Sequence, residues 1–361
     1  MRNGPKSKVS WRSLIEMEPK LGHPSLSAFH KAQPALIDGF GRQITYLRLS
    51  VTDRCDFRCV YCMAEDMTFL PKPQILSLDE LYQVSSAFVA LGVTKIRLTG
   101  GEPLVRANLS SLVERLAGLE GLKELTLTTN GARLKQFAAP LKAAGLDRIN
   151  ISLDSLDPQR FHELTRTGHL HHVLDGIRAA QDAGFERIKL NSVILRNRND
   201  DEVLNLVHFA RREQLDLTFI EAMPLGQIDE HSRAMAYISS DEILEMIQQE
   251  FSLTPTLEST GGPARYYKTP DSTIRIGVIS PHSQNFCSTC NRVRLTAEGR
   301  LILCLGNEQS VDLRSMMRTH PNDQEYLKDA ILAAIPMKPE THHFNLNEPP
   351  QIVRFMNMTG G

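Results

Sequence analysis

Short apolar runs rich in β-branched residues recur along the first two thirds of the chain and indicate β-strands. Between them, longer segments carry apolar residues at helical spacing, and three of these end at Gly92, Gly145 and Gly184, where a helix takes its C-terminal cap. The predicted strands are 44–52, 95–100, 124–130, 148–155, 189–195 and 217–225, and the predicted helices are 78–92, 108–119, 134–145, 171–185 and 200–213.

This alternation of strands and helices predicts an α/β fold with a parallel sheet, because parallel neighbours need crossover helices between them. The short connecting loops favour a barrel or partial barrel. Functional side chains gather at the carboxyl ends of the strands in such sheets. Unusual residues lie there in this sequence: three cysteines follow the first strand, TGGEP the second, TTNG the third and SLDS the fourth.

The pattern changes after residue 238. The segments predicted there are a helix at 241–251, a glycine turn at 259–264, short strands in 264–269, 273–280 and 292–305, and a helix at 324–335. We therefore divide the chain into a leader without clear periodicity (1–38), a barrel (39–225) and a C-terminal region docked on the open end of the barrel (226–361).

Composition excludes several classes of protein. The 41 lysines and arginines almost balance the 42 aspartates and glutamates, so no overall field favours nucleic acid or an anionic membrane. No stretch has the length of a membrane span, and the N-terminus lacks the apolar block of a secretory signal, so we expect a cytoplasmic protein. Without an export signal, the six cysteines favour metal binding over disulfides.

Three cysteines, Cys55, Cys59 and Cys62, form a C-x3-C-x2-C group on one loop. Structural zinc usually takes four ligands, and a redox pair of thiols would leave Cys55 without a role. A 4Fe-4S cluster has four irons, so three thiolates would leave one iron open, as in a catalytic metal centre. Gly100 and Gly101, after the next strand, allow a close approach of the backbone.

A second group consists of Cys287, Cys290 and Cys304. A zinc ribbon with His282 as the fourth ligand is one interpretation, and a second cluster with one open iron is the other. Arg292 and Arg294 alternate along a predicted strand and therefore project from one face. Two guanidinium groups beside a metal centre suit a phosphate-bearing ligand.

The first cysteine group resembles that of the radical S-adenosylmethionine superfamily, in which an aromatic residue, here Tyr61, precedes the last cysteine. TGGEP resembles the GGE motif of that family. The resemblance implies that the open iron binds S-adenosylmethionine, and that reduction of the cluster cleaves it to methionine and a 5′-deoxyadenosyl radical.

Residues 38–361 are similar, more narrowly, to the branch of the superfamily that cyclises GTP in the first step of molybdenum cofactor biosynthesis. The motifs are "GFGRQITYLRLSVTDRCDFRCVYCM", "IRLTGGEPLVR", "INISLDS", "CNRVRLTAEGRLILCL" and the terminal Gly360–Gly361. This resemblance implies an incomplete (β/α)6 barrel, with a C-terminal α+β region over its mouth, and two 4Fe-4S clusters. It also implies an electron donor such as flavodoxin or ferredoxin, a cyclic pyranopterin monophosphate synthase that acts on the product, and a monomer or homodimer.

The same resemblance assigns site residues. It implies that the six cysteines hold the two clusters, that the second cluster's open iron binds guanine, and that Gly360 and Gly361 enter the active site for radical transfer. Four arginines and a lysine among the GTP contacts would offset the charge of a triphosphate. The implied contacts are Tyr61, Gly101, Ser152 and Met223 for S-adenosylmethionine, and Arg48, Arg97, Thr128, Lys189, Arg292 and Arg294 for GTP.

Two alternatives stay open at this point. An electron carrier with two clusters is one, although carriers are usually small and complete each cluster with four cysteines. The second is another radical S-adenosylmethionine enzyme with two clusters. Enzymes of this kind that modify peptides, however, generally carry more than three cysteines in the second region.

Overall fold

The computed structural model describes residues 35–225, 236–345, 348, 352 and 354–360. Most of the predicted leader and Gly361 lie outside the described residues. Pro34–Gly361 forms one compact unit. Within the described ranges, no helix is both long and apolar enough to span a bilayer.

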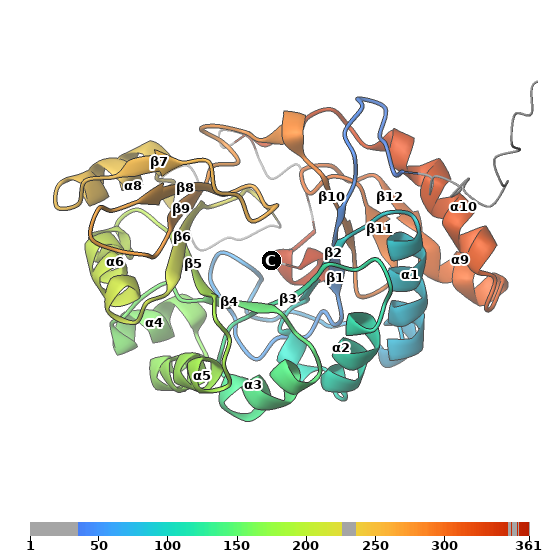
Figure 1. Ribbon diagram of the computed structural model, residues 1–361, viewed down its shortest axis with the longest axis horizontal. Helices are drawn as coiled ribbons and strands as arrows, with labels where there is room; N and C mark the ends of the chain where they lie inside the picture. Colours follow the sequence, from blue (N-terminus) through green and yellow to red (C-terminus); the bar gives the residue numbers. More distant parts are fainter. Residues whose placement is uncertain (1–34, 226–235, 346–347, 349–351, 353, 361) are drawn as a thin grey trace, which may run out of the picture. The chain divides into compact units, whose positions relative to one another are not determined.

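All six predicted barrel strands are present, and they pair in sequence order as parallel neighbours, as the crossover argument required. The sheet curves around a central space without closing (Figure 1), which confirms the expected partial barrel. The strands are β1 (Tyr46–Ser50), β2 (Lys95–Thr99), β3 (Glu124–Thr129), β4 (Arg148–Ser152), β5 (Ile188–Ile194) and β6 (Asp216–Glu221).

The five predicted helices cover the outer face of these strands (Figure 1). Gly92, Gly145 and Gly184 follow three of them at φ values of 96°, 94° and 79°, in agreement with the caps expected from the sequence. A further short helix, α4, was missed; the Asp157 side chain caps it by accepting from Arg160 N. The helices are α1 (Leu78–Ala90), α2 (Leu109–Ala117), α3 (Leu134–Ala143), α4 (Pro158–Thr165), α5 (Leu170–Asp182) and α6 (Val203–Arg212).

Strands from the C-terminal region extend the same sheet at both edges. β9 pairs in parallel with β6 on one side, and β10 pairs in parallel with β1 on the other. The predicted strand 292–305 splits into two at a turn where Gly299 has a φ of 85°. These strands are β7 (Thr254–Thr256), β8 (Arg265–Lys268), β9 (Ile276–Ile279), β10 (Arg292–Leu295), β11 (Arg300–Ile302) and β12 (Ser310–Asp312).

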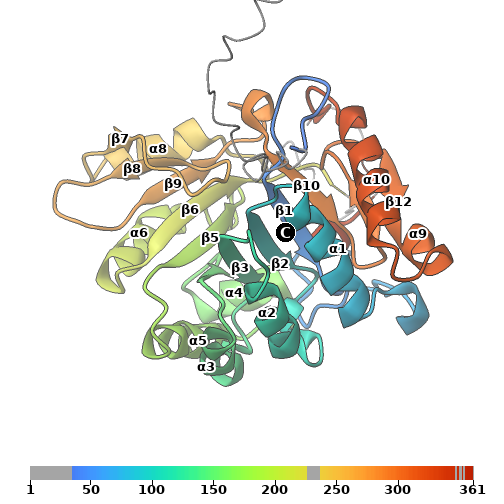
Figure 2. The same ribbon diagram turned by 45° about the vertical axis from the view of Figure 1, so that its right-hand side comes forward.

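The helices of the C-terminal region take different positions. α10 packs beside α1, as Figures 1 and 2 both show, and Arg318 of α9 pairs with Glu80 of α1. The last short helix lies inside the curved sheet, where the chain ends in Figure 1. These helices are α8 (Ser240–Gln248), α9 (Leu313–Thr319), α10 (Gln324–Ala334) and α11 (Met356–Thr359), with 3-10 turns at Lys72–Gln74, Pro103–Val105, Asp200–Glu202, Cys287–Thr289 and Ile335–Met337.

Alternate residues of each barrel strand have different surroundings, because successive side chains of a strand point to opposite faces. Leu47 and Leu49 of β1 belong to the hydrophobic core, whereas Tyr46 and Arg48 line the central cavity. The same alternation holds in β2, where Leu98 is in the core and Arg97 lines the cavity. The fold therefore places a polar inner face opposite an apolar outer one.

Candidate active site

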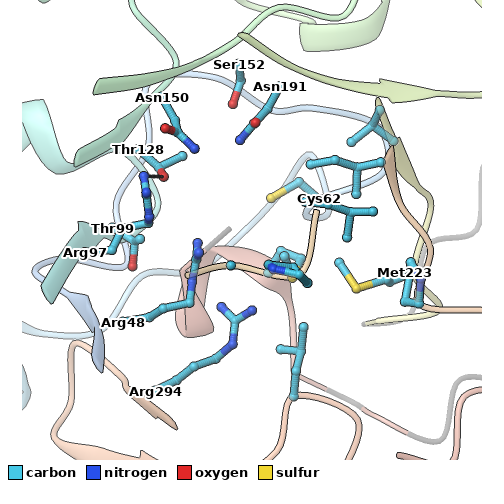
Figure 3. A pocket seen from close by; sticks show the side chains of 18 of the residues that line it. Arg48, Cys62, Arg97, Thr99, Thr128, Asn150, Ser152, Asn191, Met223 and Arg294 are labelled. Carbon is cyan, nitrogen blue, oxygen red and sulfur yellow. Dashed lines mark hydrogen bonds between the residues drawn. The ribbon is translucent and has the colours of Figure 1, made fainter. Parts of the chain in front are cut away.

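The inner face of the sheet borders a cavity of about 300 Å³ (Figure 3). Its wall comes from both the barrel and the C-terminal region. All the predicted cysteines and predicted ligand contacts other than the tail glycines line it: Arg48, Cys55, Cys59, Tyr61, Cys62, Arg97, Gly101, Thr128, Ser152, Lys189, Met223, Cys287, Cys290, Arg292, Arg294 and Cys304.

The first cysteine loop rests against the end of β2. A Cβ atom at Gly100 would lie 2.4 Å from the Thr52 carbonyl oxygen, and one at Gly101 would lie 2.4 Å from that of Arg54. The Gly101 N–H donates to the Thr52 carbonyl at 2.8 Å. The two glycines thus allow the backbone of the cysteine loop to pack closely against the end of β2, because any side chain there would push the loop away.

Acidic side chains surround the first cysteine group. Glu102 is fully buried and accepts from Asn130 N at 2.6 Å; burial raises its pKa to about 7, against the effect of its hydrogen bonds. Burial also raises the pKa of Asp154 to about 6, and this carboxyl accepts the Tyr61 hydroxyl at 2.6 Å. Tyr61 is thereby fixed beside the thiols, with its hydroxyl already engaged.

Burial, reinforced by the acids nearby, raises the pKa values of Cys55 and Cys59 well above their usual range, and it raises that of Cys62 to about 12. Thiols in such surroundings become thiolates when a metal takes the place of their protons. The donor set consists of three half-buried cysteines on one loop and therefore fits an iron–sulfur cluster with one iron left without a cysteine.

Cations surround the second cysteine group. Cys287 lies in a 3-10 turn, and Cys304 follows β11. Burial alone would raise the pKa of Cys290, but Lys338 and Arg292 lower it overall. Lys338 is 2% exposed, and its ammonium group donates to the Leu303 carbonyl at 2.6 Å. This donor set also fits a cluster held by three thiolates.

The zinc alternative gains no support from His282. Its Nε2 lies 3.1 Å from the Ala222 carbonyl oxygen and is engaged there. Among the described residues, no group of three or more histidine, cysteine, aspartate or glutamate side chains is arranged to hold a single metal ion.

Five of the six predicted GTP contacts form a partly buried cluster of positive charge on the cavity wall. Burial, together with neighbouring arginines, lowers the pKa of Arg48 to about 10 and that of Arg294 well below its usual value. Burial and Arg97 lower the pKa of Lys189 to about 7. Arg97 Nη1 donates to the Thr128 hydroxyl at 3.2 Å (Figure 3). An anionic ligand would offset such concentrated charge.

Uncharged polar groups line another part of the cavity. Figure 3 shows Asn150, Ser152 and Asn191 together, on β4 and β5. Within the described part of the chain, the buried Oδ1 of Asn191 and Oγ1 of Thr99 have no hydrogen-bond partner. A ligand with hydroxyl or amino donors would satisfy them.

The C-terminal tail reaches into this site. Arg294 Nη1 donates to the carbonyl oxygens of Thr359, at 3.3 Å, and of Gly360. The N–H of Met356 donates to the Cys62 carbonyl at 3.3 Å. Gly360 has a φ of 76°, and a Cβ there would lie 1.9 Å from Thr99 Oγ1. The described part of the tail thus contacts both the first cysteine loop and a predicted GTP contact.

Sequence reasoning missed several residues of the cavity wall. Some of them lie two positions before or after a predicted site residue on the same strand face, so the period of two could have found these. Examples are Tyr46 before Arg48, Lys95 before Arg97, Asn150 before Ser152 and Asn191 after Lys189, whereas Lys338 lies outside any strand.

Family models match most of the chain. A model described as the Radical SAM superfamily matches residues 49–210, and one described as Molybdenum Cofactor Synthesis C matches residues 215–344. The two matches lie on either side of a point near residue 212, whereas the sequence pattern placed the division at 225.

Curated relatives and solved structures resemble the chain as well. It is 58% identical over 329 residues to the GTP 3′,8-cyclase of Marinobacter nauticus, covering 91% of this chain and 99% of that protein. It is 60% identical over 331 residues to the GTP 3′,8-cyclase of Pseudomonas syringae pv. syringae, covering 91% of this chain and 100% of that protein. The crystal structure of Streptococcus suis SuiB has a TM-score of 0.58 at 14% identity and covers 82% of this chain and 69% of that chain, a likeness of fold.

Proposed function

This chain belongs to the GTP 3′,8-cyclase family of radical S-adenosylmethionine enzymes, and we propose that it joins C3′ of GTP to C8 of the same nucleotide. The product is 3′,8-cyclo-7,8-dihydro-GTP, formed in the first step of molybdenum cofactor biosynthesis. One observation carries this proposal beyond the family: both cysteine groups and the buried cations line a single cavity.

We assign the first cysteine group to a 4Fe-4S cluster and its open iron to S-adenosylmethionine. When bound, this pair would supply a 5′-deoxyadenosyl radical for removal of the 3′ hydrogen of GTP. Tyr61, Gly101, Ser152 and Met223 would contact S-adenosylmethionine at the carboxyl ends of the barrel strands. The aspartate that holds the Tyr61 hydroxyl would keep this wall in place.

The cations orient GTP. Arg48, Arg97, Lys189, Arg292 and Arg294 hold the triphosphate, because their mutual repulsion in the buried cavity is relieved by an anion. Cys287, Cys290 and Cys304 would hold a further cluster, which would offer an iron without a cysteine ligand to the guanine base. Thr128, fixed by Arg97, contacts the nucleotide from β3.

The tail takes part in the radical step rather than in binding S-adenosylmethionine. Gly360 lies against Thr99 at the end of β2 and accepts from Arg294. A segment in this position excludes water and brings the chain end to the nucleotide. The product passes to a cyclic pyranopterin monophosphate synthase, and a flavodoxin or ferredoxin supplies the electrons.

The test is an anaerobic assay with GTP, S-adenosylmethionine and a strong reductant. We expect 5′-deoxyadenosine and the cyclised nucleotide in equal amounts from protein that carries about eight irons per chain. Deoxyadenosine without a change in GTP would keep the superfamily and refute the substrate. An electron carrier would form no deoxyadenosine, and zinc with little iron would refute both cluster assignments.

A further inference from the structure

We propose that Tyr46 is a positioning residue. Without nucleotide, its negatively charged oxygen offsets the charge of the side chains that hold GTP, and it takes up a proton when the triphosphate binds. The inference deepens the proposed function and rests on it. Tyr46 is an inward-facing residue of β1, 3% exposed, and it lines the cavity.

The sheet register places Tyr46 in the middle of a lattice of cations. Tyr46 pairs with Arg292 of β10 on one side and with Lys95 of β2 on the other. The next inward-facing row, two residues along, consists of Arg294, Arg48 and Arg97. Side chains paired across parallel strands are close neighbours, and like charges in such positions repel. Of these six positions, Tyr46 is the one without a cation.

Its hydroxyl is shared between two arginines. Arg97 Nε donates to the Tyr46 oxygen at 2.6 Å, and Arg48 Nη1 donates to it at 3.4 Å. The ring itself lies beneath two further cations, with Lys95 Nζ 5.1 Å and the Arg292 guanidinium 5.9 Å from its centroid. Tyr46 therefore contacts a cation on every strand that flanks it.

The balance of charge makes the oxygen anionic. Burial would raise the pKa of Tyr46, but the surrounding cations lower it to about 6. Lys189 of β5 and Arg294 also interact with it electrostatically, and the acid Glu124 of β3 pairs with Lys95 rather than with Tyr46. At neutral pH and without nucleotide, a phenolate offsets part of the repulsion among the cations.

A triphosphate reverses this balance. Its negative charge replaces the phenolate as partner of the arginines and raises the pKa of Tyr46, so the phenolate takes up a proton. Linkage then requires that GTP affinity falls as pH rises above about 6, by up to tenfold per pH unit for one proton. Lys189, with a pKa of about 7, also takes up protons when the triphosphate binds.

The experiment measures protons directly. GTP is titrated calorimetrically into the cluster-loaded protein at about pH 8, where the terminal phosphate is already ionised, in two buffers of different ionisation enthalpy. We expect Tyr46→Phe to take up about one proton fewer than the wild type. The fall in GTP affinity with each pH unit should also be smaller in Tyr46→Phe than in the wild type, by a factor of up to ten.

Tyr266→Phe is the matched control. Tyr266 is also a buried phenol near a cation, with Lys189 Nζ 3.4 Å from its oxygen, but burial raises its pKa, so it stays neutral. This variant keeps Tyr46 and disturbs only the contact with Lys189, so it should not lose the proton that Tyr46→Phe loses. Unchanged S-adenosylmethionine affinity and iron content in Tyr46→Phe show that it is folded and loaded.

The outcomes separate the two claims. If the wild type does not bind GTP, the proposed substrate is wrong. If it binds GTP but Tyr46→Phe takes up as many protons, the role of Tyr46 is wrong and the function stands. Should Tyr46→Phe fail to fold, the ultraviolet difference spectrum of the wild type decides: GTP must remove phenolate absorbance, and an unchanged phenolate band overturns the inference.

Discussion

The two cysteine groups have the same number of donors but opposite electrostatic surroundings. The charges that act most strongly on the thiols of Cys55 and Cys59 are acids, among them Glu102 and Asp154. Around Cys290 and Cys304 they are cations, Lys338 above all. The first group occupies eight consecutive residues, whereas the second is drawn from a turn and the far side of a hairpin.

This difference matches the charges of the two ligands. S-adenosylmethionine carries a sulfonium cation and an ammonium group, which acids attract, whereas GTP carries a triphosphate, which cations attract. Both groups line one cavity, so under the proposed function the opposing fields would direct each ligand to its own cysteine group. The surroundings of the thiols, more than their number, therefore distinguish the two sites.

Removing one cysteine from each group tests the comparison most strongly. Cys55→Ala should abolish 5′-deoxyadenosine formation, a loss of roughly a thousandfold or more, because the metal that binds S-adenosylmethionine is no longer held. Cys287→Ala should still form deoxyadenosine but no cyclised nucleotide. Each variant should retain about four irons per chain. If Cys287→Ala also lost all deoxyadenosine, the division of roles would be wrong.

Removing a cation near the second group should affect only the nucleotide. Arg294→Ala should weaken GTP binding by about 10- to 100-fold, the worth of a charge-assisted hydrogen bond, and leave S-adenosylmethionine affinity unchanged in anaerobic binding measurements. Arg178→Ala is the control, since Arg178 is 70% exposed and pairs only with Asp175 among the interactions described. Equal weakening of both ligands by Arg294→Ala would contradict separate fields.

The tail links the two sites, and a methyl group at Gly360 should disturb that link. The added Cβ would clash with Thr99, so we expect Gly360→Ala to reduce cyclisation by about tenfold while deoxyadenosine still forms. Gly41→Ala is the matched control, because Gly41 has a similar φ of 78° and nothing within 4 Å of an added Cβ. Full cyclisation by Gly360→Ala would show that the position of Gly360 against Thr99 is not needed for the reaction.

The smallest expected effect is on the second cluster's potential. Lys338→Met removes a cation beside Cys290, so the reduced cluster loses stabilisation and its potential should fall by tens of millivolts. A redox titration followed by electron paramagnetic resonance measures both clusters. A shift of the first cluster alone would contradict the comparison, and Lys135→Met, 70% exposed, should shift neither.

The strands, helices and cysteine groups were predictable because each depends on local pattern. Strand period, glycine caps and motif spacing are properties of neighbouring residues, and the predicted contacts do meet in one cavity. The pattern also contained Tyr46 and Lys95, two positions before Arg48 and Arg97. They were missed because an isolated tyrosine or lysine in a strand carries no motif.

The remaining features depend on contacts between distant segments. The pairing of β10 with β1 and of β9 with β6 joins strands with weak individual patterns, so their neighbours could not be read from sequence. Lys338 contacts the second cysteine group from a loop, which no sequence pattern marks. α4 has only 8 residues, too few for a helical period to stand out. Residues 1–34 of the proposed leader and Gly361 lie outside the described residues, and their proposed roles stay predictions.

The pairing of β1 with β10 also has a consequence for biosynthesis of the protein. β1 and the first cysteine loop leave the ribosome early, whereas Arg292–Leu295, their neighbour in the sheet, follows more than two hundred residues later. At about 5–20 residues per second, the edge of β1 waits at least ten seconds for that partner. The first cysteine loop is therefore synthesised long before the sheet that carries it is complete.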